Sequence, residues 1–143
     1  MKLVIASDEK THLTNSVVSY LKKKDHKLTL LGDLVDKKKR WKWVDIGVEA
    51  AKKVVSSKAD YGIVFCWSGT GITMAANKVK GARAALCWDK ETASLARKWD
   101  DANILGMNLR ATSESVAKEI IDAFLSTEFD EESLNQAHKL DKL

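Results

Sequence analysis

The sequence has no proline, and only two of its 143 residues are cysteine, Cys66 and Cys87. Two cysteines are too few for the disulfide framework of a small secreted domain, so we expect a reducing compartment and a cytoplasmic protein. No stretch approaches the roughly 18 apolar residues of a membrane-spanning helix. Residues 1–6 turn polar too early for a signal peptide, so we expect neither a leader nor a membrane partner.

The excess of positive charge is small, with a net charge of +4, and it is gathered in lysine-rich clusters at residues 22–24, 37–40 and 52–53. Trp41 and Trp43 follow the second cluster, an arrangement that could stack on nucleic-acid bases. Acidic residues lie between the clusters, and no nucleic-acid-binding motif accompanies them. We therefore interpret the clusters as solvated surface and expect no nucleic-acid partner.

The chain is organised around a strand, a turn and a helix start within residues 61–79. Its apolar run, rich in β-branched and aromatic residues, predicts a buried strand. After glycines at 69 and 71, helical spacing follows in Ile72, Ala75, Ala76 and Val79. Backbone N–H groups at a helix N-terminus attract anions. Because Cys66, Ser68 and Thr70 stand where these groups converge, the stretch predicts an anion site with a thiol and two hydroxyls.

Strand and helix patterns alternate along the whole chain, which we interpret as one domain covering residues 1–143. Apolar runs predict strands at 3–6, 28–31, 61–66, 83–87 and 103–107, and residues 33–43 are expected to be a polar loop. Further helices are marked by Leu13, Val17, Val18 and Leu21; by Val44, Val48, Ala51 and Val55; by Leu95 and Trp99; and by Val116, Ile120, Ala123 and Phe124 after a cap at Thr112 or Ser113.

Strands that are apolar almost throughout are typical of a parallel sheet covered on both faces. With right-handed crossovers, the pattern predicts an α/β fold: a three-layer α/β/α sandwich with a doubly wound, five-stranded, Rossmann-like parallel sheet. Such sheets bind ligands beyond the carboxyl ends of their strands. Those ends are expected to hold Asp8, Cys66, Trp88, Asp89 and Arg110.

Four segments resemble the ribose-5-phosphate isomerase B and galactose-6-phosphate isomerase family: Cys66 to Lys78, Gly81 to Cys87, Asp101 to Leu105, and Ile5 to Asp8. The resemblance covers nearly the whole chain. It implies interconversion of phosphorylated aldoses and ketoses without a cofactor or a metal. It also implies a homodimer or homotetramer whose active sites are shared between chains.

The resemblance also implies roles for individual residues. Cys66 would be the general base acting through a cis-enediolate, and Ser68 would serve the proton transfer between the sugar oxygens O1 and O2. The substrate would be bound by Asp8, Glu9, Gly69, Thr70, Gly71, Trp99, Asp100 and Arg110. The residues alone leave other interpretations open: Cys66 as a small core residue, Ser68 and Asp8 as helix caps, and Arg110 as an exposed surface residue.

The sequence departs from the family pattern at several positions. Glu9 and Trp99 replace histidines, and the histidine at the second position opens the sugar ring in relatives. Trp43 and Trp67 add bulk near the expected site. The usual phosphate-binding arginines are missing from the tail, about residues 129–143, which we expect to pack on a partner chain. Alternatives are therefore a tetrose or tetrulose 4-phosphate isomerase, or a non-catalytic member that binds a sugar phosphate or a nucleotide.

Overall fold

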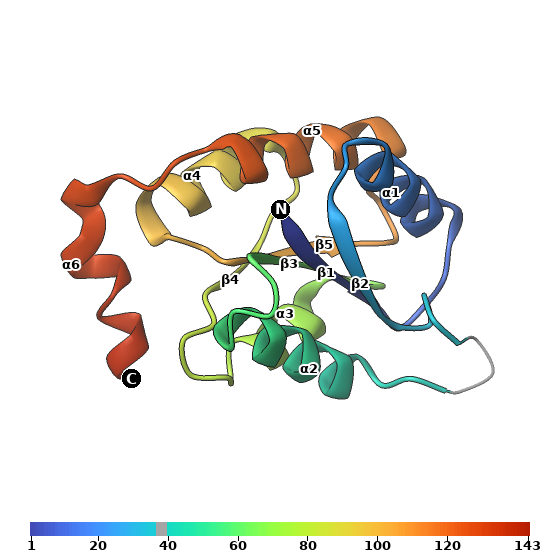
Figure 1. The fold of residues 1–143 in the computed structure, drawn as a ribbon, viewed down its shortest axis with the longest axis horizontal. Helices are drawn as coiled ribbons and strands as arrows, with labels where there is room; N and C mark the ends of the chain where they lie inside the picture. Colours follow the sequence, from blue (N-terminus) through green and yellow to red (C-terminus); the bar gives the residue numbers. More distant parts are fainter. Residues whose placement is uncertain (37–39) are drawn as a thin grey trace.

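The computed structural model describes residues 1–36 and 40–143 and shows a five-stranded parallel sheet between two layers of helices (Figure 1). The strands lie in the order β2-β1-β3-β5-β4, which confirms the predicted doubly wound sandwich. In chain order the elements are β1 (Lys2–Ser7), α1 (His12–Lys23), β2 (Lys27–Gly32), α2 (Trp43–Val55), β3 (Tyr61–Cys66), α3 (Thr70–Ala76), β4 (Ala84–Leu86), α4 (Lys90–Asp100), β5 (Ile104–Asn108) and α5 (Glu114–Ser126).

The central strands are buried on both faces because side chains alternate along each strand. On β3, Ile63 and Phe65 point into the layer that contains α1, α4 and α5, whereas Val64 and Cys66 point into the layer that contains α2 and α3. All four side chains are essentially inaccessible to solvent. The continuous apolar run of β3 therefore contributes side chains to two separate hydrophobic clusters. Its last residue, Cys66, belongs to the cluster on the α2–α3 side.

Three helices begin at the side-chain caps that their sequences favour. The Thr11, Asp89 and Ser113 side chains each accept a hydrogen bond from a backbone N–H in the first turn of α1, α4 and α5. Of the two predicted caps for α5, Ser113 is the one used, accepting from the Val116 N–H at 3.3 Å.

Two helices bury residues that differ in part from those that marked them in the sequence. In α2, Val44 and Val55 are exposed, and the buried side consists of Ile46, Gly47, Ala50, Ala51 and Val54. This helix carries two overlapping apolar stripes, and the one with smaller residues packs closely on α3. In α4, Trp99 is 49% exposed, and the buried residues are Ala93, Ala96 and Arg97. The helices are present where they were predicted, but Val44, Val55 and Trp99, which marked them in the sequence, do not lie on their buried sides.

Two predicted boundaries also need correction. Trp43 is the first residue of α2 instead of part of the preceding loop, and residues 37–39 of that loop lie outside the described residues. Helix α3 ends at Ala76, so Val79 follows the helix. The Asn77 side chain explains why the chain turns here, because it accepts from the Ala84 N–H (2.7 Å) and donates to the Ala84 carbonyl (2.8 Å) at the start of β4.

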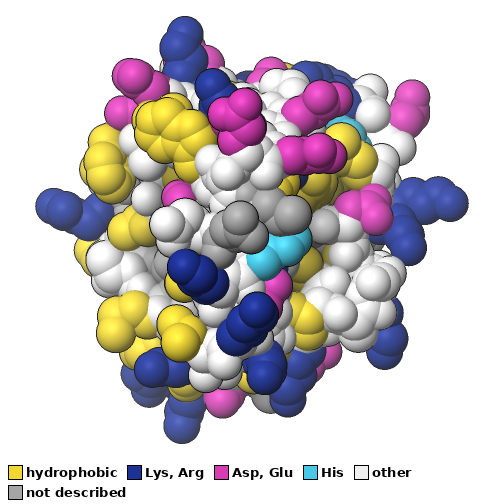
Figure 2. Space-filling model, turned by 90° about the vertical axis from the view of Figure 1, so that its left-hand side faces the viewer, with side chains coloured by type: hydrophobic (Ala, Val, Ile, Leu, Met, Phe, Trp, Pro, Cys, Tyr) yellow, Lys and Arg dark blue, Asp and Glu magenta, His cyan; other side chains and the backbone are white. Residues whose placement is uncertain are grey.

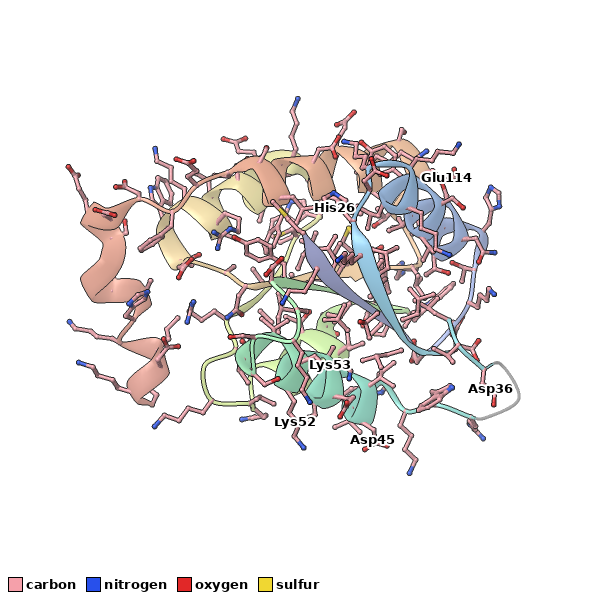
Figure 3. All side chains as sticks on the ribbon, viewed as in Figure 1. His26, Asp36, Asp45, Lys52, Lys53 and Glu114 are labelled. Carbon is pink, nitrogen blue, oxygen red and sulfur yellow. The ribbon has the colours of Figure 1, made fainter. Side chains whose placement is uncertain are left out.

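The charged surface is mixed. On α2, Lys52 points away from the sheet (Figure 3), and Lys53 pairs with Glu49 at 3.4 Å. Seen from the side of the C-terminal segment, basic and acidic side chains are interspersed with hydrophobic ones (Figure 2). No helix within residues 1–36 and 40–143 is long and apolar enough to cross a membrane.

The chain ends in a segment that stands away from the sandwich beside α4, at the left of Figure 1. It contains η1 (Glu131–Ser133), α6 (Leu134–Ala137) and η2 (Leu140–Lys142). In this single chain it contacts its own body: the Asp130 N–H donates to the Lys98 carbonyl at 2.8 Å, and Ala137 is buried. That this segment packs on a partner chain stays a prediction.

Candidate active site

The sheet has one topological switch point, between β1 and β3. The crossover from β1 runs through α1 on one face, and that from β3 runs through α3 on the other, which opens a crevice where the two strands end. A pocket of about 250 Å³ lies there. Its lining residues come from three separate segments and are Asp8, Trp43, Cys66, Trp67, Ser68, Thr70 and Gly71.

Cys66 is held at the carboxyl end of β3 by its own carbonyl, which accepts from the Gly69 and Leu109 N–H groups, both at 3.1 Å. The residue is 3% exposed and lines the pocket. Cys87, the other cysteine, is enclosed in the opposite layer. Burial, assisted by the Asp89 carboxylate, raises the pKa of the Cys87 thiol to about 12. Only one of the two thiols therefore lies where a ligand could enter.

The turn after Cys66 depends on Gly69, whose φ of +76° is strained for any residue with a side chain. A Cβ at this position would lie 2.9 Å from the Met107 carbonyl carbon. The Thr73 hydroxyl, on α3, stabilises the turn by donating to the Gly69 carbonyl at 2.7 Å. Since the Gly69 N–H is already bonded to the Cys66 carbonyl, the predicted amide donors left for a ligand are those of Gly71 and of Thr70, whose N–H makes only a long contact of 3.4 Å with Ser68 Oγ.

Two hydroxyls meet beside the thiol. Ser68 Oγ and Thr70 Oγ1 lie 2.7 Å apart and share a hydrogen bond, and the Thr70 N–H reaches Ser68 Oγ at 3.4 Å. Both residues are exposed at the pocket. This pair can pass a proton or hold a ligand oxygen because each hydroxyl both donates and accepts.

Asp8 faces these groups from the end of β1. Its Oδ1 atom is buried and has no hydrogen-bond partner among the described residues. Burial, with the nearby Glu9 and Asp33 charges, raises the pKa of the Asp8 carboxyl. The turn is held by Ser7, whose Oγ donates to the Glu9 carbonyl at 2.6 Å. An unpaired, partly desolvated carboxylate oxygen in a pocket is ready to accept a hydrogen bond from a ligand hydroxyl.

The other predicted site residues lie outside this pocket. Glu9 is exposed next to Asp8, and Arg110 is exposed beyond β5, where its N–H donates to the Trp67 carbonyl at 3.1 Å. Trp99 and Asp100 end α4, at the amino ends of the strands and thus at the other end of the sheet from Cys66. There, Asp100 borders a larger hollow of about 580 Å³ that Leu140 and Leu143 of the C-terminal segment also line.

One residue that supports the site was missed from the sequence. A Cβ at Gly106 on β5 would lie 2.0 Å from Thr73 Oγ1, so that glycine makes room for the hydroxyl that holds Gly69. A glycine within an otherwise apolar strand was the available signal, because it marks a close approach. Among residues 1–36 and 40–143, no three His, Cys, Asp or Glu side chains gather as metal ligands.

Comparison with known proteins gives consistent results. A sequence model of the family described as Ribose/Galactose Isomerase matches residues 3–143. The galactose-6-phosphate isomerase subunit LacB of Clostridium acetobutylicum is 38% identical over 122 residues, which is 84% of this chain and 68% of that protein. The D-erythrulose-4-phosphate isomerase of Pectobacterium atrosepticum is 37% identical over 99 residues, covering 69% of this chain and 64% of that protein.

A solved structure matches over a longer stretch. The ribose 5-phosphate isomerase of Thermotoga maritima superposes with a TM-score of 0.92 at 34% identity, covering 99% of this chain and 98% of that one. Across five curated relatives, by contrast, the matched sequence spans only 55% to 68% of their own length.

Proposed function

This chain belongs to the Ribose/Galactose Isomerase family of sugar-phosphate isomerases, and we propose that it interconverts the aldose and ketose forms of a small phosphorylated sugar with Cys66 as the general base. The observation that carries the proposal is the pocket at the β1–β3 switch point. It brings a thiol, a carboxylate with an unpaired oxygen and a pair of hydroxyls to one place.

The reaction requires one carbon-bound proton to move. The Cys66 thiolate removes the proton from C2 of the aldose, and the electron pair left behind forms the C1–C2 double bond of a cis-enediolate. The carbonyl oxygen on C1 gains a proton as its double bond to carbon breaks. Cys66 then returns a proton to C1 while O2 loses its proton and becomes the ketone oxygen. Ser68, bonded to Thr70 at 2.7 Å, is suited to carry the proton between the two oxygens.

The remaining groups of the pocket bind the substrate. Asp8 accepts a hydrogen bond from a sugar hydroxyl through its unpaired Oδ1. The Thr70 and Gly71 N–H groups donate to the oxygen on which negative charge develops, an arrangement that stabilises an enediolate more than the neutral sugar. Arg110 lies outside the pocket, where its N–H donates to the carbonyl of the lining residue Trp67, and we assign to its exposed side chain the positive charge that attracts the phosphate.

We further propose that the site is shared between two copies of the chain, as a homodimer or a dimer of dimers. Trp99 and Asp100, which the family resemblance assigns to substrate, lie at the other end of the sheet from Cys66. They can join the pocket only if a second copy presents them. The C-terminal segment lies at the same end as these two residues and would approach the partner with them.

A second candidate is a four-carbon sugar 4-phosphate as substrate. Trp43 and Trp67 line a pocket of about 250 Å³, which is smaller than the ~300–1,000 Å³ typical of ligand sites. A tetrose 4-phosphate needs no ring opening, because its 4-oxygen carries the phosphate and cannot close a furanose. Trp99, whose indole has no useful proton to exchange, fits such a substrate. One relative is named D-erythrulose-4-phosphate isomerase.

The test is an activity panel of four-, five- and six-carbon sugar phosphates, measured for the unmodified chain and for Cys66→Ala and Cys87→Ala. We expect Cys66→Ala to lose activity by about 10²-fold or more, the usual size of a general-base effect, while Cys87→Ala keeps it. Full activity in Cys66→Ala would refute the assignment of the base. A preference for ribose 5-phosphate over erythrulose 4-phosphate would refute the proposal of a four-carbon substrate but would leave the assignment of Cys66 as the base unaffected.

A further inference from the structure

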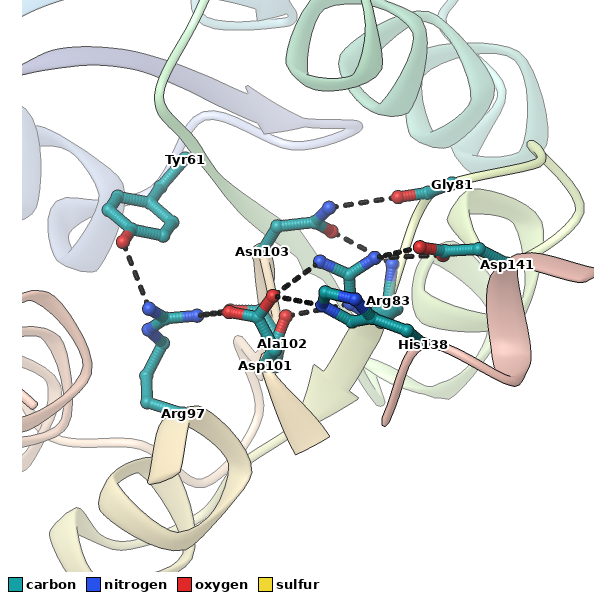
Figure 4. A network of polar contacts seen from close by, with 9 residues as sticks. All are labelled: Tyr61, Gly81, Arg83, Arg97, Asp101, Ala102, Asn103, His138 and Asp141. Atoms are coloured by element: carbon teal, nitrogen blue, oxygen red, sulfur yellow. Dashed lines mark hydrogen bonds and ion pairs between the residues drawn. The ribbon is translucent and has the colours of Figure 1, made fainter. Parts of the chain in front are cut away.

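Asp101, the residue directly after Trp99 and Asp100, is held from both sides (Figure 4). It ends α4 with a φ of +46°, a left-handed conformation that is uncommon outside glycine. Its Oδ1 accepts from Arg97 Nη1 at 2.9 Å, and its Oδ2 accepts from Arg83 Nη2 at 2.8 Å. The Arg83 Nε atom also donates to the Asp101 carbonyl at 2.8 Å. Two arginines therefore fix both the side chain and the backbone of this turn.

The two arginines have little freedom of their own. Arg97 is 5% exposed, donates to the Ala102 carbonyl (2.7 Å) and the Tyr61 hydroxyl (3.0 Å), and lies over the Tyr61 ring. The Arg83 side chain is 12% exposed. A buried guanidinium that loses its carboxylate is strongly unfavourable, so both arginines hold Asp101 in place.

The same cluster ties the C-terminal segment to the turn. Arg83 Nη1 donates to both carboxylate oxygens of Asp141, at 2.8 and 2.9 Å. His138 stacks on Phe129 and brings its Nε2 to 3.4 Å from Asp101 Oδ2. Arg83 thus bridges two aspartates, one at the end of α4 and one in η2, close to the chain terminus.

We propose that Asp101 is the positioning residue for the turn that carries Trp99 and Asp100. Asp141 couples the C-terminal segment to this turn, because it binds Arg83, which in turn holds Asp101. The inference rests on the proposed function for its catalytic consequence, since the turn is assigned there to the site of a second copy. Asp100 and the segment also border the same hollow of about 580 Å³, so the cluster joins its two walls. Docking of the segment sets the direction in which Trp99 and Asp100 project.

The test uses Asp141→Asn, which leaves every direct contact of Asp101 in place. Its matched control is Asp122→Asn on α5, a carboxylate that also accepts two hydrogen bonds, from the Tyr20 hydroxyl at 2.6 Å and from Lys24 Nζ at 2.9 Å. Hydrogen exchange is followed at the Asp101 and Ala102 amides, which both donate to the Ala96 carbonyl. The Thr127 amide at the end of α5 serves as the internal reference.

We expect Asp141→Asn to speed exchange at Asp101 and Ala102 by about tenfold relative to the reference amide. The reason is that Arg83, which holds the turn, loses its charge-assisted hydrogen bonds to Asp141. Asp122→Asn should leave both amides unchanged. In the isomerase assay, Asp141→Asn should lower kcat with little effect on KM, as expected when a reacting geometry is loosened. Asp101→Asn, which tolerates the left-handed conformation, should produce the larger effect on both readouts.

Unchanged exchange at Asp101 and Ala102 in Asp141→Asn would overturn the coupling between the C-terminal segment and the turn. An equal increase in exchange in Asp122→Asn would also overturn it, because the effect would then reflect general destabilisation of the protein. Faster exchange with kcat unaltered in an active enzyme would overturn the positioning role. The exchange measurement requires no activity, so it decides the coupling even if the unmodified chain isomerises no sugar phosphate. That separate outcome would refute the proposed function instead.

Discussion

The indole of Trp43 rests directly on Gly71. A Cβ built on Gly71 would lie 3.1 Å from ring atoms of Trp43, closer than most real contacts. Trp43 begins α2, and Gly71 lies in the first turn of α3, so this contact sets how the two helices meet above the pocket. The missing side chain at 71 allows a large ring to form the pocket wall next to the proposed amide donors.

Replacing Gly71 with Ala should therefore displace the Trp43 ring and destabilise the protein by about 1–3 kcal/mol, the usual cost of overpacking. Helix propensity alone predicts the opposite sign, because Ala is the better helix former by about 1 kcal/mol. The double variant Trp43→Ala/Gly71→Ala should recover most of the loss caused by Gly71→Ala in denaturant unfolding. Strictly additive effects in the cycle would show that the ring and the glycine are not coupled.

Asp8→Asn should make the protein more stable and less active. Burial and the neighbouring carboxylates raise the folded-state pKa of Asp8, so folding of the charged form is penalised above the unfolded pKa. We expect the melting temperature of Asp8→Asn to exceed that of the unmodified chain by roughly 2 °C at pH 7, and the difference to vanish as the pH falls and Asp8 becomes protonated. Loss of the substrate hydrogen bond should lower kcat/KM about tenfold.

A lower melting temperature for Asp8→Asn at pH 7 would contradict the sign of that linkage. Unchanged kcat/KM would remove Asp8 from the substrate contacts without affecting the assignment of Cys66.

Cys87 should weaken the fold at alkaline pH. Burial raises its folded-state pKa to about 12, so the unfolded chain loses the thiol proton at lower pH than the folded chain does. The stability contributed by the neutral buried thiol should therefore be complete at neutral pH and decrease as the pH rises above about 8.5, the ordinary thiol value. Cys87→Ala lacks this group, and the comparison of unfolding at pH 7 and pH 10 should show a shallower decline in the variant. Equal declines would contradict the prediction.

A shared site predicts complementation between inactive chains. Cys66→Ala removes the base, and Asp100→Ala removes a residue that we assign to the neighbouring copy. Mixing the two variants under conditions of subunit exchange should restore activity, since a hybrid dimer holds one site in which both residues are intact. A stable monomer by light scattering at micromolar concentration, or no recovery on mixing, would argue against sharing.

The strands were predictable because their burial leaves a simple signature. The apolar run of β3 has the same bounds in the sequence and in the structure, from Tyr61 to Cys66. Cys66, Ser68 and Thr70 were likewise placed together because they are close in the chain. Asp8 could be added to the site because the carboxyl ends of adjacent parallel strands generally form the ligand crevice, and the structure places it in the same pocket.

Other features depend on tertiary structure that no local pattern records. Arg97 is charged and sits on a helix, which indicates a solvated position, yet it is buried against Tyr61 and neutralised by Asp101. The larger Trp99 is exposed instead. The engaged Gly69 amide could not be foreseen either, because it depends on the path of the turn back to the Cys66 carbonyl.

The central claim, that Cys66 moves a carbon-bound proton, is tested most directly by isotope exchange. The protein is incubated with a sugar phosphate that it isomerises in deuterium oxide, and deuterium at C1 and C2 is followed by NMR. We predict that the unmodified chain and Cys87→Ala introduce deuterium into the carbon skeleton, whereas Cys66→Ala, folded to the same melting temperature within about 2 °C, introduces none. Deuterium incorporation by Cys66→Ala at the rate of the unmodified chain would contradict the account.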